Sequence, residues 1–301
     1  MSKGRSPTMY TSMKEMLWHA SENSYAVMAI NCTDMEQARA ICHAAAAEHA
    51  PVIIDISPRQ MKAHATPEVM VPMIRAIAEP LAVPVALNLD HGGEYADIVR
   101  CIQAGFSSVM IDSSSFPFEE NVRRAQLVAS IAHAHGVSCE AELGHVGVAA
   151  AGDGRSADMY TNVEQAVEFV ERTHCDCLAV AIGTAHGSYP DDFVPSLDFD
   201  RLAELKAALK MPLVLHGGSG AGEENIRLCV ELGINKINVC TDLFKFQRGA
   251  MHERLNAEPG IDYMDIQMVG EEAAIGFIRD YMRMIGCSGT YTFDGSGEEL
   301  D

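Results

Sequence analysis

The chain has 301 residues, a length at which a single α/β barrel domain is still possible. Its formal net charge of −20 argues against nucleic acid or an anionic membrane surface as a partner, although a metal, helix N-termini or a placed arginine could still bind an anionic substrate. The start of the chain lacks an apolar signal segment, and no run reaches the ~20 apolar residues of a membrane span. Nine cysteines lie mostly inside predicted elements, so we expect reduced thiols in a cytoplasmic protein.

Short apolar runs alternate along the chain with segments of helical period. The helical period is clear over 35–50 and 163–174, where small and apolar residues share one face. Strands that alternate with helices predict right-handed crossovers and a single-domain α/β protein, a (β/α)8 TIM barrel. A doubly wound open sheet is the alternative, but it favours a glycine-rich turn after the first strand, and 30–37 has none. The eight predicted strands are 25–30, 51–57, 84–89, 107–112, 137–143, 177–182, 212–215 and 236–240.

Three segments lie outside this regular alternation. We expect 1–20 to form an N-terminal helical extension, 21–290 to form the barrel, and 291–301 to be a flexible acidic tail. Residues 144–160, after the fifth strand, are small and glycine-rich. A long loop at the carboxyl rim of a barrel is the usual place for a lid that is poorly ordered without substrate.

Three histidines, each followed by glycine, come after apolar runs. They are His91, His186 and His216, assigned to the ends of the third, sixth and seventh strands. A catalytic zinc needs three protein ligands and one open coordination position. Unrelated turn histidines are the alternative reading, but three at equivalent positions favour a metal site.

Polar residues also follow the other strands, at the end of a barrel where enzymes carry out catalysis. Asp90 stands beside His91, and adjacent residues of an extended strand point to opposite sides, so the two cannot both be metal ligands unless the strand end bends. A carboxylate beside a metal that is not its ligand suits acid–base catalysis. The alternative is that Asp90 orients a metal ligand. Asn31 and Ser57 are equally well explained as hydrogen-bonded turn residues. The remaining members of this ring are Asp112, Glu142 and Asn238.

Two turns at the end of the predicted barrel have the composition of a phosphate site. GGSG (217–220) follows the seventh strand and opens a helix near Glu223, and NVCT (238–241) closes the eighth strand. Backbone N–H groups and hydroxyls at these two positions are the common phosphate ligands of α/β barrels.

Six segments in the same order resemble the class II, metal-dependent ketose-bisphosphate aldolase family, of the fructose- or tagatose-bisphosphate type. The resemblance covers about residues 12–289. Its motifs are LDHG (89–92), SVMIDSS (108–114), EAELGHVG (140–147), LAVAIGTAHG (178–187), LVLHGGSG (213–220) and KINVCTDL (236–243).

The resemblance implies a role for each matching residue. Asp90 resembles the family's proton donor to the aldehyde oxygen, and the three histidines resemble its zinc ligands, with one Zn²⁺ per chain. Asp112 and Glu142 resemble acidic residues near the zinc that sometimes form a second cation site. A monovalent cation near the phosphate site is a further expectation. The residues expected to bind substrate are Asn31, Ser57, Gly187, Gly217, Gly218, Ser219, Asn238, Val239, Cys240, Thr241 and Arg279, the last acting on the distal phosphate of a neighbouring subunit's substrate.

The sequence departs from the family pattern at two places. Many relatives have histidine where this chain has Asn88. The family's lid carries an acidic residue after a Gly-Gly pair, whereas GHVGVAAAGDGRS (144–156) lacks the pair and offers Asp153. Asp153 is therefore the expected base for the carbon-bound proton, with His145 and Glu142 next in line. The alternative is that Asp153 is a solvated turn residue of AGDG (151–154).

The resemblance implies retro-aldol cleavage of a phosphorylated ketose to dihydroxyacetone phosphate and an aldehyde, by a homodimer or homotetramer. Zinc would stabilise the enediolate, Asn238 would donate to the same charge, and Asp90 would take the C4 hydroxyl proton. A Schiff-base mechanism needs a lysine inside the barrel, and we place Lys236 far from the rim.

Two other functions remain as alternatives. A zinc hydrolase would carry a His-x-His pair on the first strand, which 30–32 lacks. A non-catalytic barrel subunit would not need Asp90 and three histidines.

Overall fold

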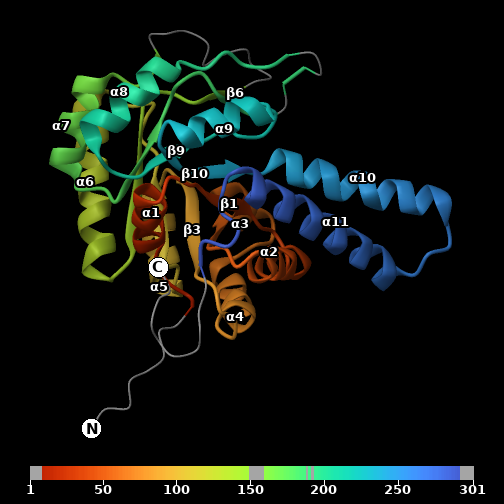
Figure 1. Cartoon of the computed structure of the whole chain (residues 1–301). Coiled ribbons are helices and arrows are strands. Elements are labelled where there is room, and N and C mark those ends of the chain that lie inside the picture. The colour runs from red at the N-terminus through yellow and green to blue at the C-terminus, as the bar shows by residue number, and fades with distance from the viewer. Residues whose placement is uncertain (1–8, 149–158, 188, 191–192, 292–301) are drawn as a thin grey trace.

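The computed structural model describes residues 9–148, 159–187, 189–190 and 193–291 (Figure 1). Eight parallel strands form a closed barrel in the order β1-β10-β9-β7-β5-β4-β3-β2. The predicted (β/α)8 barrel is therefore confirmed, and the open sheet is excluded. The barrel strands are β1 (Val27–Asn31), β2 (Val52–Ile56), β3 (Val85–Gly92), β4 (Ser108–Ile111), β5 (Ser138–Leu143), β7 (Cys177–Val180), β9 (Leu213–Leu215) and β10 (Ile234–Val239).

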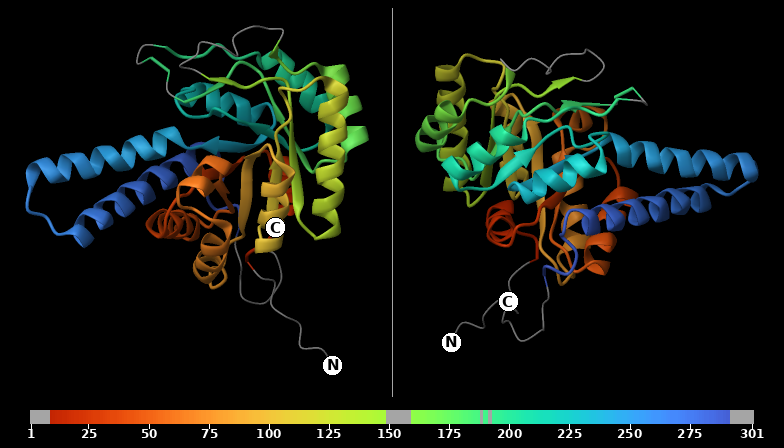
Figure 2. Two further views of the ribbon diagram at one scale, coloured as in Figure 1. Left: turned by 180° about the vertical axis from the view of Figure 1, so that it is seen from behind. Right: turned by 45° about the horizontal axis from the view of Figure 1, so that its top comes forward.

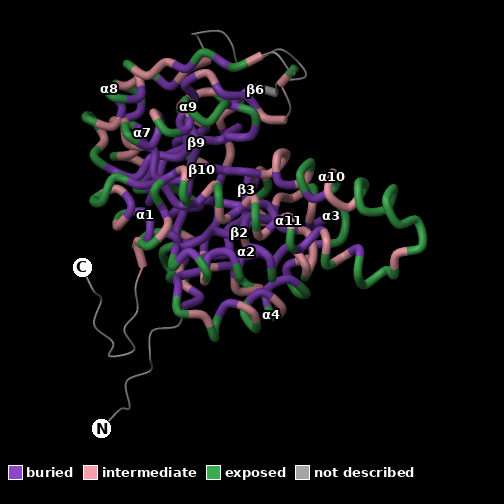
Figure 3. The backbone as a smooth tube through the Cα atoms, turned by 45° about the vertical axis from the view of Figure 1, so that its right-hand side comes forward, coloured by how far each residue is buried: buried purple, intermediate pink, exposed green. Residues whose placement is uncertain are grey.

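Helices surround the barrel and cover its outer face (Figure 1). Nearly every strand residue is buried, because one face meets the helices and the other fills the barrel (Figure 3). The helices are α1 (Met13–Glu22), α2 (Met35–Ala47), α3 (Pro58–Ala63), α4 (Pro67–Ala78), α5 (Tyr95–Ala104), α6 (Phe118–Ala134), α7 (Val163–Thr173), α8 (Phe199–Leu209), α9 (Glu223–Glu231), α10 (Thr241–Ala257) and α11 (Tyr263–Met284).

Helix α1 lies against the amino ends of the barrel strands. Tyr10, just before it, pairs with Val85 at the start of β3, and the Met13 amide donates to Ser108 Oγ at the start of β4. Four apolar side chains of α1 are buried there. The helix thus closes the end of the barrel opposite to the predicted site.

Helices α10 and α11 form an antiparallel hairpin that extends away from the barrel (Figures 1 and 2). Its inner half packs on α2, and α11 is tied down where Arg279 and Arg283 both pair with the buried carboxylate of Glu48. The tip of the hairpin carries exposed apolar side chains, including Tyr263 (74 % exposed) and Met264 (70 %). This projecting hairpin was not among the features predicted from the sequence.

A second, two-stranded sheet lies beyond the end of β7. Its strands β6 (Gly147–Val148) and β8 (Ala185–His186) are parallel, with Val148 opposite His186. His186 was assigned to the end of the sixth barrel strand, which is wrong, because that strand, β7, ends at Val180. Pairing with the start of the predicted lid brings His186 back over the barrel mouth.

All nine cysteines are free thiols, and eight of them are buried. None of the helices in the described ranges has the length and apolar composition of a membrane span.

Candidate active site and metal centre

The carboxyl ends of the strands open into a pocket of about 910 Å³. It gathers side chains from loops that are far apart in sequence, as expected for the catalytic end of a barrel. Of the residues predicted from sequence, this pocket is lined by Asn31, Ser57, Asp90, His91, His186, Gly187, His216, Gly217, Ser219, Asn238, Cys240 and Thr241.

A bend at the end of β3 places Asp90 and His91 in the same pocket. His91 has a φ of 51°, in the left-handed region that non-glycine residues seldom adopt, and the register with β4 shifts between Leu89 and Gly92. The following Gly92 is required, because a Cβ there would overlap the Met110 carbonyl oxygen. The strained strand end turns two neighbouring side chains toward one point, as often found at functional sites.

The three histidine rings converge at the mouth of the barrel. The ring centroid of His91 lies 4.8 Å from that of His186 and 4.5 Å from that of His216. One ring nitrogen of each histidine lies within 4.8 Å of the others, so the three could hold one metal ion. Gly217 permits this approach, since its φ is +68° and a Cβ would lie 2.7 Å from the backbone oxygen of Ala185.

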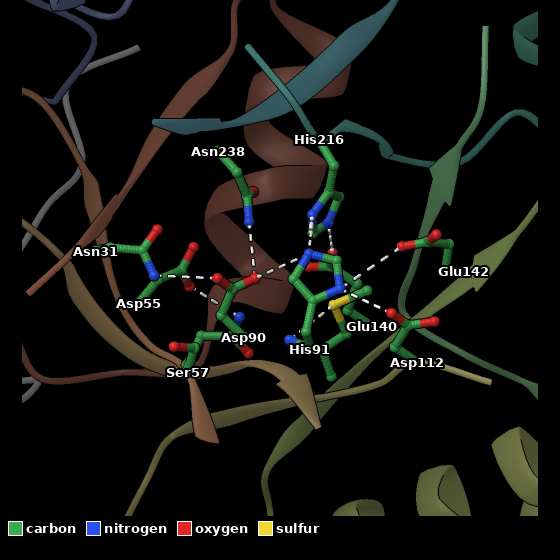
Figure 4. A network of polar contacts seen from close by, with 12 residues as sticks. Asn31, Asp55, Ser57, Asp90, His91, Asp112, Glu140, Glu142, His216 and Asn238 are labelled. Atoms are coloured by element: carbon green, nitrogen blue, oxygen red, sulfur yellow. Dashed lines mark hydrogen bonds and ion pairs between the residues drawn. The ribbon is translucent and has the colours of Figure 1, made fainter. Parts of the chain in front are cut away.

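Carboxylates orient two of these rings from behind (Figure 4). His91 Nδ1 donates to Asp112 Oδ2 at 2.8 Å, and His216 Nε2 donates to Glu140 Oε1 at 2.7 Å. The opposite nitrogens, His91 Nε2 and His216 Nδ1, lie 2.9 Å apart and face each other. A carboxylate on one nitrogen that leaves the other free for metal is the usual arrangement of zinc-binding histidines.

Glu140 was not among the site residues predicted from the sequence. The signal was present in EAE (140–142), because alternate residues of one strand share a face. Both glutamates are buried and reach histidines of the site.

The electrostatics of the site favour a bound cation. Burial, followed by the neighbouring His91, lowers the pKa of His186 to about 4, so that ring is neutral as a ligand must be. Burial also lowers the pKa of His91, but the charge of Asp90 and the hydrogen bond that His91 donates to Asp112 outweigh it and raise this pKa to about 10. Excess negative charge therefore surrounds His91.

A second group of possible ligands lies on the other side of His91. Asp112 and Glu142 join that ring in a cluster whose ligand atoms lie within 4.8 Å of one another. Glu142 Oε2 is buried and has no hydrogen-bond partner among the described residues. Burial and then the charge of Asp112 raise the pKa of Glu142 to about 8. An orphaned carboxylate oxygen at this place suits a second cation position.

Asp90 is held between two amides. Its Oδ2 accepts from Asn31 Nδ2 and its Oδ1 accepts from Asn238 Nδ2, each at 3.0 Å. Burial raises the pKa of Asp90, but His91, His216 and Lys236 outweigh that effect and leave the pKa below its usual value. Asp90 is thus an oriented carboxylate able to accept a proton.

The end of β2 carries both a helix cap and part of the pocket wall. Ser57 caps α3 and forms a capping box with Gln60, whose side chain also accepts from Asn31. The turn interpretation therefore holds for Ser57, which caps α3, whereas Asn31 donates to Gln60 and Asp90 on other elements. Both residues line the pocket.

The expected phosphate turns meet at one side of the pocket. Helix α10 begins at Thr241, and its Asp242 accepts from the Gly220 amide while Asp242 N donates to Ser219 Oγ. The helix N-terminus and the GGSG turn thus face the same space, which suits an anion.

Five predicted site residues within the described ranges do not line this pocket: Asp112 and Glu142, which cluster with His91, and Gly218, Val239 and Arg279. Val239 is buried in the core, Gly218 packs on Ile237, and Arg279 is paired with Glu48 in its own chain. Asp153 lies outside the described residues, as does most of the predicted lid.

The position predicted for the Lys236 side chain is wrong. Lys236 was placed far from the rim, yet its fully buried side chain runs inside the barrel and its Nζ lies 2.7 Å from Asn238 Oδ1. The length of the side chain explains the difference, because four carbons carry the charge beyond its own strand position. Burial alone would lower the pKa of Lys236, but Asp55 and Glu140 raise it, so this amine is charged and unsuited to Schiff-base chemistry.

Comparisons with known proteins agree with this geometry. The family described as "Fructose-bisphosphate aldolase class-II" matches residues 11–290. The chain belongs to the class II fructose-bisphosphate aldolase family. A probable fructose-bisphosphate aldolase of Bacillus subtilis (strain 168) is 39 % identical over 284 residues, covering 90 % of this chain and 96 % of that protein.

Solved structures of similar proteins extend the match to the whole barrel. The YdjI aldolase from Escherichia coli K12 is 30 % identical with a TM-score of 0.82, covering 93 % of this chain and 98 % of that chain. A putative fructose-1,6-bisphosphate aldolase from Coccidioides immitis is 28 % identical with a TM-score of 0.81, covering 91 % of this chain and 96 % of that chain. This class II aldolase is therefore a carbon–carbon lyase. This excludes the two alternatives, a zinc hydrolase and a non-catalytic barrel subunit.

Proposed function

We propose that this aldolase reversibly cleaves a ketose 1-phosphate or 1,6-bisphosphate, of the fructose or tagatose type, to dihydroxyacetone phosphate and an aldehyde. The observation that supports it most is a carboxylate, Asp90, fixed by two amides in the same pocket as three convergent imidazoles. Fructose-bisphosphate aldolase is also the name of the family and of the Bacillus relative.

His91, His186 and His216 fit one zinc ion. They offer ring nitrogens in a compact group, and carboxylates hold two of the rings in position. A zinc ion at this point would act as a Lewis acid on the ketone end of the substrate. Asp112 and Glu142 fit a second cation position, and a monovalent cation near the phosphate turns remains part of the proposal.

Two side chains of the protein, Asp90 and Asn238, are our candidates for proton transfer and for stabilising the developing charge. In cleavage the Asp90 carboxylate accepts the proton of the C4 hydroxyl, and in condensation it returns that proton to the aldehyde oxygen. Asn238 Nδ2 carries two hydrogens, of which one is bonded to Asp90. The other can donate to the negative charge that develops on the substrate. Asp153 remains our proposal for the base that moves the carbon-bound proton.

Gly187, Gly217, Ser219, Cys240 and Thr241 would surround the phosphate of the dihydroxyacetone half. They combine glycine backbone with a helix N-terminus, so N–H groups can approach the anion closely. We therefore propose that the shared half of the substrate binds at the β9 and β10 end of the pocket.

Two arginines are placed to meet an anionic group on the aldehyde half. Arg59 on α3 and Arg248 on α10 line the pocket. Among the arginines that the structure describes, these two make no hydrogen bond or ion pair with another described residue, whereas Arg254 on the same α10 pairs with Glu258. We therefore assign the distal phosphate of a bisphosphate to Arg59 and Arg248, and Arg279 remains a proposed contact to a neighbouring subunit's substrate.

Arg59→Ala and Arg248→Ala should each weaken the use of a 1,6-bisphosphate while leaving the 1-phosphate unaffected. Loss of one charge-assisted bond at the exposed rim should lower kcat/KM for the bisphosphate about tenfold. Arg254→Ala is the matched control and should change neither substrate. An equal loss of kcat/KM for both substrates would contradict the proposal that these arginines bind the distal phosphate.

The exposed apolar tip of the α10–α11 hairpin supports a homodimer or homotetramer. Large apolar groups at such a projecting tip favour burial against another copy. Nine free thiols support a reducing compartment, the cytoplasm.

A substrate screen tests the proposed function. Ketose 1-phosphates and 1,6-bisphosphates of fructose and tagatose should be supplied in turn, and release of dihydroxyacetone phosphate measured. At least one should be cleaved with zinc present, and cleavage of none would overturn the substrate class.

A further inference from the structure

A buried ion network lies inside the barrel directly below the catalytic pocket. At its centre is Lys236 on β10, whose Nζ donates to Glu140 Oε2 at 2.8 Å and to Asn238 Oδ1 at 2.7 Å. Asp55 Oδ2 lies 3.9 Å away. The side chains of Lys236, Glu140 and Asp55 are 0 % exposed. Burying an ammonium is costly unless each of its hydrogens finds a partner, so this network needs a reason.

One branch of the network leads to a proposed metal ligand. Glu140 accepts from Lys236 through Oε2 and from His216 Nε2 through Oε1. Since the carboxylate accepts at Nε2, that nitrogen carries the ring hydrogen. The lone pair of His216 is then on Nδ1, which faces His91 Nε2 at 2.9 Å. The Lys236–Glu140 pair thus selects the tautomer that can bind metal.

The other branch leads to the catalytic carboxylate. An ammonium has donors only, so it must meet the oxygen of the Asn238 amide. This fixes the amide orientation and turns Nδ2 toward Asp90 Oδ1, 3.0 Å away. Without the ammonium, the amide could rotate and present its oxygen to Asp90, where two acceptors would repel.

We propose that Lys236 is a positioning residue that acts on both halves of the site at once: it selects the His216 tautomer through Glu140 and fixes the Asn238 amide against Asp90. Lys236 does not line the pocket. This role rests on the proposed zinc-dependent cleavage, because it explains how the metal ligand and the acid–base group are held in register.

Lys236→Met removes the ammonium while keeping most of the side-chain length. Loss of a partner behind a metal ligand typically costs about 10–100-fold in metal affinity or activity. We expect zinc affinity, measured by competition with a chromophoric chelator, to fall by about that factor. We also expect kcat at saturating zinc to fall by about 10–100-fold with little change in KM, because the Asn238 amide is no longer fixed. The absorption spectrum of the cobalt-substituted protein should change as well.

Lys206→Met is the matched control. Lys206 on α8 is half-buried and donates to Ser21, Met211 and Asn235, on the outside of the barrel. Its loss should lower thermal stability while zinc affinity, cobalt spectrum and kcat stay at their wild-type values.

Two outcomes would overturn the proposal. The first is a folded Lys236→Met protein with wild-type zinc affinity, cobalt spectrum and kcat. If that variant does not fold, the double variant Lys236→Met/Glu140→Gln removes both charges of the ion pair and must show the same losses. Wild-type zinc affinity, cobalt spectrum and kcat in the double variant are the second outcome that would overturn the proposal. A wild-type protein that binds zinc but cleaves no ketose phosphate would instead refute the proposed function, while zinc affinity and cobalt spectrum would still test Lys236.

Discussion

Asp90→Ala is expected to retain the fold and the metal but lose cleavage. Removal of a positioned acid–base group should lower kcat by about 10²–10⁴-fold with a much smaller effect on KM. The structural reason is that Asp90 is the pocket carboxylate that both Asn31 and Asn238 orient. Steady-state release of dihydroxyacetone phosphate, together with zinc content, provides the measurement.

Asp90→Asn is the more specific variant because it removes the carboxylate charge and preserves the shape of the side chain. It should be as inactive as the alanine variant, since an amide cannot take the hydroxyl proton. Asp200→Asn, an exposed acid on α8, is the control and should keep full activity. If the Asp90 variants lose zinc as well as activity, Asp90 orients a ligand, and the acid–base role must be reassigned.

Removal of the metal is expected to have the second large effect. A Lewis acid contributes several kcal/mol to such a reaction, so chelation should lower kcat/KM by about 10²–10⁴-fold. The fold should persist, because the barrel core is formed by apolar strand residues rather than by the site. Activity should return on addition of zinc, while far-ultraviolet circular dichroism stays unchanged throughout.

Histidine variants provide the matching genetic test. His186→Ala and His216→Ala should abolish tight zinc binding. His133→Ala, which removes a half-exposed histidine paired with Asp176 on the outer surface, should leave it intact. Full activity in extensively chelated, zinc-free enzyme would refute the metal mechanism.

The alternation of apolar runs with segments of helical period predicted the barrel, because the residues that form each βαβ unit lie close together in the sequence. The positions of Asp90, His91 and His216 followed from the same pattern, since strand ends in a closed barrel meet at one rim. His186 was assigned to the wrong element for a physical reason. Its location depends on pairing between β6 and β8, a contact between distant segments that no local period reveals.

Other features could not be predicted because they depend on side-chain reach or on surface context. Lys236 lies near the start of β10, and only the packed barrel shows that its ammonium reaches Asn238. Glu140 stood in a recognisable EAE pattern, but its bond to His216 depends on how two distant strands face each other. Arg279 is bound by Glu48 on α2's C-terminal end, a partner that sequence spacing does not indicate.

The central claim, that three histidines hold the catalytic metal beside Asp90, is tested most directly by anomalous diffraction at the zinc absorption edge from crystals of active enzyme. We predict one strong peak per chain, about 2.0–2.1 Å from His91 Nε2, His216 Nδ1 and a ring nitrogen of His186. A fully active crystal form with no peak at this position, or with its zinc bound elsewhere, would contradict the account.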